Sequence, residues 1–415
     1  MRIWSSHFGR RAGTALAMMM LMGTPALAQG PVGSGGLTAT LTDKEPEEGV
    51  IKLGVLSLAP GLTLTEVGHD DNVYDEAVAP KADWVVAGTP DVSLFTRLRW
   101  IQLSLYAGVP FQYYHHYESE RDFGLAYRGR ADFLLSRVSP FVGAGRTRTR
   151  TRPNGEIDTR ADQQIDELSG GIAYELFAHG QAFGALIHTK VDYTDAFQSG
   201  ISLNQSLGRE SDEYQGGIKT QLTPLLTMQL RGALRQDRFL VDPTRDGDTW
   251  SGTAVFSFDA AAVISGNASI AYQDYQPNDP ALKRFRGVTG NGFITYPILE
   301  IGRVNVGYNR SIEYSFDQAE AYYIENTIRA IYTHRLAGAV DLQAQAARSF
   351  FNYDARSSST ARQDQLETYN GNLGYNLKNR TRVAANYEYA RRRSPAFAER
   401  NYIRRRIYLS WMVAF

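Results

Sequence analysis

Hydrophobic and polar residues alternate with a period of two near the end of the chain, the spacing of a β-strand with one apolar face. Ile407, Leu409, Trp411 and Val413 occupy one face, and Phe415 continues it. The same alternation recurs in earlier segments, which include residues 183–193, 304–308, 340–346, 369–377 and 383–389. Each segment is half apolar and half polar, so the pattern predicts an all-β protein.

The connections between these segments alternate in length, and this signal separates two all-β architectures. Short turns are expected near Leu98, Ser139, Gly180, Pro224, Asp259, Pro297, Leu336 and Lys378. Long polar connections are expected around residues 70–81, 117–121, 153–159, 196–209, 242–248, 276–282, 315–320, 355–363 and 391–400. Outer-membrane barrels have short periplasmic turns and long extracellular loops, whereas a soluble sandwich has no reason to sort its loops this way.

Two strands per repeat of roughly 40 residues predict a transmembrane antiparallel barrel of about 18 strands, with 16 as the fallback count. The first strand is expected near Leu58–Val67. The predicted organisation is therefore a signal peptide in residues 1–28, a flexible periplasmic segment in residues 29–54 and a barrel in residues 55–415.

The two ends of the chain support export to the outer membrane. Arg2, Arg10 and Arg11 precede a short apolar run, and Ala26-Leu27-Ala28 fits a cleavage site before Gln29. The apolar run is too short to span a bilayer. A final strand that stops on the aromatic Phe415 is similar to the C-terminal assembly signal of outer-membrane proteins, which implies recognition by the barrel-assembly machinery.

Composition agrees with a barrel and excludes several chemistries. The 415 residues contain no Cys, so disulfide frameworks, thiol catalysis and cysteine zinc sites are excluded. The chain has 38 Gly and 24 Tyr, and aromatic residues form girdles at both water interfaces of a barrel. Lysine and arginine number 44, as do aspartate and glutamate, so net charge identifies no partner.

The sequence gives little support for catalysis or for a bound cofactor. None of the seven His residues lies in a triad-like arrangement, and the Gly-x-Ser-x-Gly nucleophile motif is absent. Acidic clusters at residues 70–72 and 242–248 do not match the twelve-residue calcium loop, so turn formation explains them better. We therefore predict a non-enzyme without a metal or cofactor.

Arginines are the most informative charged residues. In Arg146-Thr147-Arg148-Thr149-Arg150 the alternation puts the arginines on one face. Because an arginine in the lipid midplane costs about 2–4 kcal/mol, we expect that face to line the lumen. The predicted pore-lining set is Arg128, Arg130, Asp132, Arg146, Arg148, Arg150, Arg231, Arg235, Arg303 and Arg329. These residues would select anions or, alternatively, would pair with inward carboxylates and only order the lumen.

A second basic cluster flanks the last outer loop. It comprises Arg391, Arg392, Arg393, Arg400, Arg404 and Arg405. At that height the outer leaflet carries the phosphates of lipopolysaccharide, which guanidinium groups bind well. We therefore expect these six arginines to contact lipopolysaccharide. The predicted compartment also excludes nucleic acid as a partner.

Several short segments resemble the β-barrel porin type 2 family of outer-membrane proteins. They are Leu62–Tyr74, Tyr127–Asp132, Asp192–Asp195 and Arg404–Phe415, spread over nearly all of the mature chain. The resemblance implies a barrel, often associated with exopolysaccharide or capsule secretion, and polysaccharide-export components as partners. It supplies no catalytic residues.

These observations predict a channel with an arginine-biased polar lumen that passes anionic saccharides or takes part in exopolysaccharide export. A general uptake porin and a non-conducting structural or adhesive barrel remain open. A non-conducting barrel would need an inward-folding loop, for which Ala196–Arg209 is the candidate.

Overall fold

The computed structural model describes residues 51–194, 196–259, 264–298, 301–317, 320–353, 362–377 and 381–414. The predicted signal peptide, most of the predicted lead-in, the turn at Lys378 and the terminal Phe415 lie outside the described residues.

The chain folds into a closed antiparallel β-barrel of 18 strands, as the repeat of about 40 residues predicts. The first half of the wall contains β2 (Leu56–Asp70), β3 (Asp83–Arg97), β4 (Ile101–Gly108) continued by β5 (Phe111–Tyr114), β6 (Asp122–Phe123) continued by β7 (Leu125–Phe133), β8 (Val138–Thr151), β9 (Ala161–Phe177), β10 (Gly180–Thr194), β13 (Arg209–Thr223) and β14 (Leu226–Phe239). The second half contains β15 (Gly247–Phe258), β16 (Ser265–Pro277), β17 (Phe285–Ile298), β18 (Gly302–Tyr314), β19 (Tyr322–Ala337), β20 (Val340–Tyr353), β21 (Arg362–Leu377), β22 (Thr381–Arg393) and β23 (Tyr402–Ala414).

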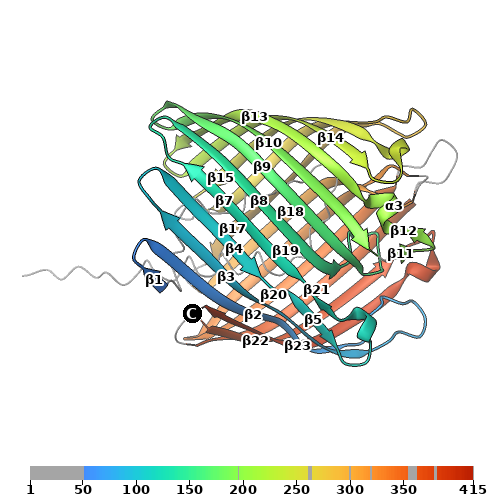
Figure 1. Cartoon of the computed structure of the whole chain (residues 1–415). Helices are drawn as coiled ribbons and strands as arrows, with labels where there is room; N and C mark the ends of the chain where they lie inside the picture. Colours follow the sequence, from blue (N-terminus) through green and yellow to red (C-terminus); the bar gives the residue numbers. More distant parts are fainter. Residues whose placement is uncertain are drawn as a thin grey trace, which may run out of the picture.

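Hydrogen bonds between the first and last wall strands close the barrel. β2 pairs with β23 from Gly61↔Ala414 to Asp70↔Arg406, with an irregularity between Leu64 and Val67. Closure matters because a barrel leaves no unpaired strand edge in contact with lipid. A short strand, β1 (Ile51–Leu53), pairs with the start of β2, within the segment predicted to be an unstructured lead-in. Figure 1 shows β1 and the C-terminal end at the same end of the barrel.

The period-two pattern assigns one face of each strand to lipid and the other to the lumen. On β9, Leu168 and Ile172 are among the exposed large apolar residues, whereas Gln163 and Ser169 on the opposite face are buried. Directly paired residues of antiparallel strands share a face, so this assignment carries round the wall through the register. The outer face is apolar in its middle band because it contacts hydrocarbon, and the inner face is polar.

The loops sort as predicted. Short connections of two to four residues, such as 98–100, 134–137 and 224–225, lie at the end of the barrel that carries β1. The long connections lie at the other end, where they contain η2 (Glu118–Glu120), η3 (Pro243–Arg245), η4 (Ala398–Arg400), α3 (Leu203–Leu207) and the small hairpin β11 (Phe197–Gln198) and β12 (Ile201–Ser202). The long-loop end is therefore extracellular (Figure 1).

The outer end of the β18–β19 hairpin leaves the wall and folds inward. β17 pairs with β18 only up to Gly290↔Arg310, although β18 and β19 continue to pair up to Tyr314↔Tyr322. Ile312 and Tyr314 continue the face that carries the exposed Tyr308, yet both are buried. The Tyr314 ring lies 5.1 Å from that of Phe239, on the inner face of β14. The hairpin end therefore packs against the inside of the barrel.

Candidate functional site: the barrel lumen

The connection between β8 and β9, residues 152–160, crosses the lumen and does not extend into solvent. Asn154 donates a hydrogen bond to the Tyr314 carbonyl (3.1 Å), and Arg392 on β22 donates one to the Gly155 carbonyl (2.9 Å). These partners are 160 and 237 positions away in the chain. Glu156 and Ile157 are buried. We call residues 152–160 the crossing loop; the sequence predicted only a long outer loop here.

Ion pairs anchor the crossing loop to the far wall. Asp158 accepts a hydrogen bond from Arg392 (2.8 Å) and lies 3.4 Å from Arg400. Arg392 also contacts Asp364 on β21 at 3.1 Å, and Arg400 donates to the Glu156 carbonyl. Guanidinium groups and carboxylates that are buried together stabilise a structure only when nearly all their polar atoms are bonded. This network therefore holds the loop in one position.

Glu156 is the most buried acid of the crossing loop. Its carboxylate accepts hydrogen bonds from the Ser315 hydroxyl and the Phe316 backbone amide, both at 3.0 Å. Burial raises the pKa of Glu156, while the Arg400 guanidinium and these hydrogen bonds act in the opposite direction. The loop thus contains a carboxyl group that binds a proton more readily than an exposed glutamate does.

A large apolar cluster fills the space between the crossing loop, the inward hairpin and the wall. Its buried members are Ile157, Ala161, Val191, Tyr193, Ala196, Leu203, Leu207, Phe239, Tyr275, Leu282, Phe285, Ile312, Tyr314, Phe316, Ala321 and Tyr322. The segment predicted as a plug, Ala196–Arg209, contributes three of these residues. That segment, the crossing loop and the hairpin therefore form one barrier inside the barrel. This barrier narrows the extracellular half of the lumen.

Seven of the ten predicted pore residues lie on the inward face. Arg128 and Arg130 on β7 pair in register with Gly145 and Gly143, on the face of β8 opposite Arg146. The Arg130 guanidinium lies 4.0 Å from the ring of inward-facing Phe141. The register also places Asp132, Arg231, Arg235, Arg303 and Arg329 on the inner face.

The predicted facing of Arg146, Arg148 and Arg150 is wrong. Arg146 pairs with Tyr127 and Asp166, on the face that carries the exposed Leu168. All three arginines therefore point away from the lumen. They lie near the extracellular end of β8. An outward charge there meets headgroups and water and costs only about 0–1 kcal/mol. The sequence argument applied the midplane cost to residues that sit at the interface.

The inward arginines divide into paired and unpaired groups. Arg130 contacts Asp132 at 2.6 Å, and Arg235 contacts Asp237 at 3.0 Å. Arg128, Arg231, Arg303 and Arg329, by contrast, form no direct ion pair with any carboxylate among the described residues. Arg231 donates to the Gln215 amide oxygen (3.1 Å), and the Arg128 guanidinium lies over the Tyr106 ring at 4.6 Å. The lumen therefore presents positive charges without direct counter-charges.

Strand alternation divides the six arginines predicted to contact lipopolysaccharide, so the prediction is wrong for half of them. Arg392 and Arg400 are buried against the crossing loop. Arg404 lies inside the barrel against Asp70 and Asp75. Arg391, Arg393 and Arg405 lie on the outer face. Consecutive strand residues point to opposite faces, so a run of arginines cannot form one outer patch.

Two further features are absent from the residues that the structure describes. These residues contain no group of three or more His, Asp or Glu side chains placed to hold a metal ion. None of the helices in the described part of the chain is long and apolar enough to cross a membrane. The polar groups of the lumen suit binding and guiding a solute.

A closed 18-stranded barrel with sorted loops and a polar, narrowed lumen defines a porin-like outer-membrane protein. The chain belongs to the family described as Putative beta-barrel porin 2, whose model matches residues 49–415. The family and the fold place the protein in the bacterial outer membrane. No curated protein sequence matches the chain.

Solved channel structures share the fold at low sequence identity. OpdK of Pseudomonas aeruginosa is 11% identical, with a TM-score of 0.52, over 86% of this chain and 99% of that one. OpdQ of the same organism is 12% identical with a TM-score of 0.51, over 86% and 99%. OccAB3 of Acinetobacter baumannii is 11% identical with a TM-score of 0.51, again over 86% and 99%.

Proposed function

We propose that this protein is a selective channel for small anionic solutes, with anionic saccharides as the substrate class. The observation that carries the proposal is the set of unpaired inward arginines, Arg128, Arg231, Arg303 and Arg329. A guanidinium group binds carboxylates and phosphates through two parallel hydrogen bonds. Neighbouring amide and hydroxyl side chains, such as Gln215 and Tyr106, suit sugar hydroxyl groups.

The narrowed lumen supports small solutes over a polymer. A polysaccharide chain would have to displace the crossing loop, which is held by Arg392 and Arg400. A small solute needs only a passage beside it. Export of exopolysaccharide therefore stays an alternative that requires loop movement, and a non-conducting barrel is the alternative that predicts no current at all.

Two further expectations from the sequence belong to this proposal. Residues 1–28 direct the chain across the inner membrane and are removed between Ala28 and Gln29. The barrel-assembly machinery then inserts the chain. Transport through the lumen requires no chemical step by the protein.

Reversal potentials of the purified protein in a planar bilayer under a salt gradient test the proposal. We expect the wild type to be anion-selective and the Arg231→Gln/Arg329→Gln variant to be less so. The anion selectivity of both proteins should weaken as the salt concentration rises. The physical reason is that fixed charges attract counterions only within a Debye length, about 10 Å at 0.1 M salt.

The matched control is Arg146→Gln/Arg148→Gln, which removes two arginines from the outer face of β8 and should leave the reversal potential unchanged. A liposome-swelling assay extends the test to saccharides. It compares the swelling of protein-containing liposomes in a uronic acid with their swelling in the corresponding neutral hexose. Equal selectivity of the lumen variant and the wild type would refute the arginine-based mechanism.

A further inference from the structure

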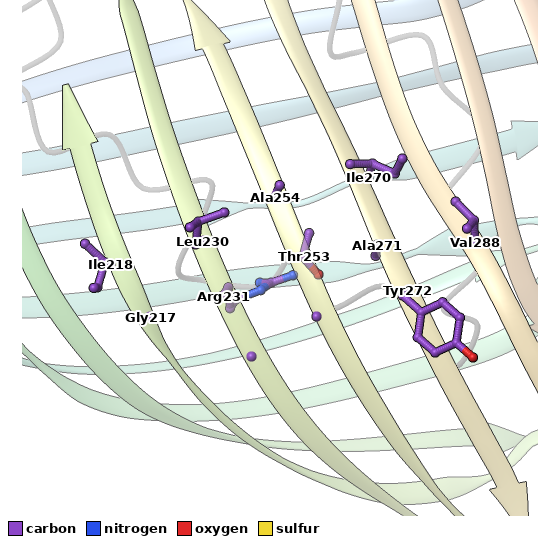
Figure 2. Close-up of a pocket in the computed structure, with 12 residues that line it drawn as sticks. Gly217, Ile218, Leu230, Arg231, Thr253, Ala254, Ile270, Ala271, Tyr272 and Val288 are labelled. Atoms are coloured by element: carbon purple, nitrogen blue, oxygen red, sulfur yellow. The ribbon is translucent and has the colours of Figure 1, made fainter. Parts of the chain in front are cut away.

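An apolar groove lies on the outer wall of the barrel, across β13 to β17. Leu230, Ala254, Ile270 and Val288 contribute one side chain from each of four successive strands, β14 to β17, as Figure 2 shows. The groove has a volume of 620 Å³. Arg231 and Thr253, also labelled in Figure 2, alternate with these residues along their strands and face the lumen.

Glycines form the floor of this groove. Gly232 and Gly252 are paired neighbours on β14 and β15, on the outward face. A Cβ atom added at either position would meet no other atom within 4 Å. The flanking side chains project into lipid, whereas the glycines have no side chain. The outer wall therefore has a depression here whose shape suits a long apolar chain.

A group of outward arginines lies immediately above the groove on its extracellular side. Arg286 is two residues before the groove residue Val288, or roughly 7 Å along β17. Arg286 and Arg284 both contact Asp274 on β16, at 3.0 and 2.5 Å. Arg310 on β18 donates to the Val288 carbonyl (3.0 Å) and to the Asn326 side chain (2.7 Å). Two guanidinium groups thus share one carboxylate, which leaves one positive charge in excess, and the hydrogen-bond partners of Arg310 are neutral.

Aromatic residues mark the depth of this group in the membrane. Trp250 pairs with Asp274, and Asp274 pairs with Arg286, so the three share one row on the outer face. Trp250 is an exposed large side chain in this row, and Tyr272, at the edge of the groove two residues before Asp274, is exposed as well. Tryptophan and tyrosine on the outer face of a barrel concentrate where lipid headgroups begin. Arg284 and Arg286 therefore lie at the height of outer-leaflet phosphates, with the groove at acyl-chain depth.

We propose that the outer wall over β14–β18 is a binding site for lipopolysaccharide. A lipid A phosphate binds Arg284 and Arg286, and one acyl chain of the same molecule occupies the groove over Gly232 and Gly252. The site differs from the β22–β23 cluster expected from the sequence, half of which faces the lumen. It is also independent of the transported solute, because it lies on the opposite side of the wall.

The test measures lipid A binding to the full-length protein, purified in detergent and depleted of lipopolysaccharide. The probes are bisphosphorylated lipid A and the same lipid A without its phosphates, and the readout is the shift in the heat-induced unfolding midpoint against lipid concentration. We expect tighter binding of the phosphorylated form to the wild type. Arg286→Gln should weaken it about tenfold, the change expected from one lost charge-assisted hydrogen bond, while Arg284 stays on Asp274.

Gly252→Leu tests the groove independently, because an added Cβ at Gly252 meets no other atom within 4 Å and a side chain there projects from the outer face into the groove. We expect this variant to lose affinity for both lipids. Two controls on β20 and β21, outside the proposed site, should bind as the wild type does: Arg348→Gln, which removes an outward arginine, and Gly371→Leu, at an outward position where an added Cβ likewise meets no atom within 4 Å.

Three outcomes would overturn the proposal. They are wild-type affinity in both Arg286→Gln and Gly252→Leu, an equal loss in the control variants, and equal wild-type affinity for the two forms of lipid A. An effect of Arg286→Gln without one of Gly252→Leu would overturn the acyl-chain assignment and keep the phosphate site.

Discussion

At the scale of single residues, the facing of each charge decides its role. Asp237 on the inner face of β14 is fully buried and bonds to Ser211, Arg235 (3.0 Å) and the Tyr314 hydroxyl (2.8 Å). Asp248, on the next strand but on the outer face, forms an exposed ion pair with Arg238 at 3.1 Å. Low dielectric surroundings and complete hydrogen bonding make the first interaction strong, whereas solvent screens the second.

We therefore expect Asp237→Asn to lower the free energy of unfolding by about 3–5 kcal/mol, because it leaves buried arginines short of counter-charge. Asp248→Asn should change it by about 0–1 kcal/mol. Unfolding by heat or urea in detergent, followed by the mobility shift of the folded barrel, measures both. Similar losses of unfolding free energy in the two variants would show that the buried contacts of Asp237 stabilise the barrel no more than the exposed ion pair of Asp248 does.

At the scale of elements, the crossing loop is the part of the channel that other elements must hold in place. Its position depends on the Tyr314 carbonyl of β18, on Arg392 of β22 and on Arg400 of η4, not on the strands that it connects. The inward end of the β18–β19 hairpin depends in turn on the loop, because Ser315 and Phe316 bond to Glu156. The two elements should therefore move together.

The raised pKa of Glu156 predicts that the crossing loop is held more firmly in acid. A group with a pKa raised above its ordinary value of 4.5 contributes stability below that value, and this contribution is lost as pH rises through the raised pKa. Single-channel conductance should therefore increase as the pH rises from 4.5 to neutral. The increase should vanish in Glu156→Gln, which keeps the hydrogen-bond acceptor and leaves Asp158 and Asp364 in place. A persisting increase in Glu156→Gln would assign the effect to other groups.

At the scale of the whole molecule, the sorting of loops fixes the orientation of the barrel in the membrane. The long connections carry all the described 3-10 helices and α3, and the short connections lie beside β1 and the end of β23 (Figure 1). An even number of strands requires both chain ends on one side, which is the periplasmic side in an outer-membrane barrel.

Because the chain contains no Cys, single cysteines report this topology cleanly. Val78→Cys, in the long connection after β2, should react on intact cells with a reagent that cannot cross the membrane, since Val78 is 83% exposed. Ser136→Cys, in the short connection between β7 and β8, should react only after the outer membrane is opened. Labelling of Ser136→Cys on intact cells would reverse the orientation.

The sequence by itself determined the number of strands, the sorting of their loops and the class of protein. These features depend on the period of two and on turn residues, which act over a few neighbouring positions. The first strand and the turns near Leu98, Ser139, Gly180, Pro224 and Leu336 were placed to within about three residues of their observed positions.

The tertiary structure alone decided which charges meet in the lumen. The outward facing of Arg146 follows from its register with Tyr127, and no local pattern reveals that register. The crossing loop bonds to residues 160 or more positions away, so its sequence reads only as a polar connection. Arg392 and Arg400 looked like surface charges because their partner Asp158 lies 234 or more positions earlier. Pairing between distant segments depends on the closed barrel and therefore cannot be predicted from local sequence propensity.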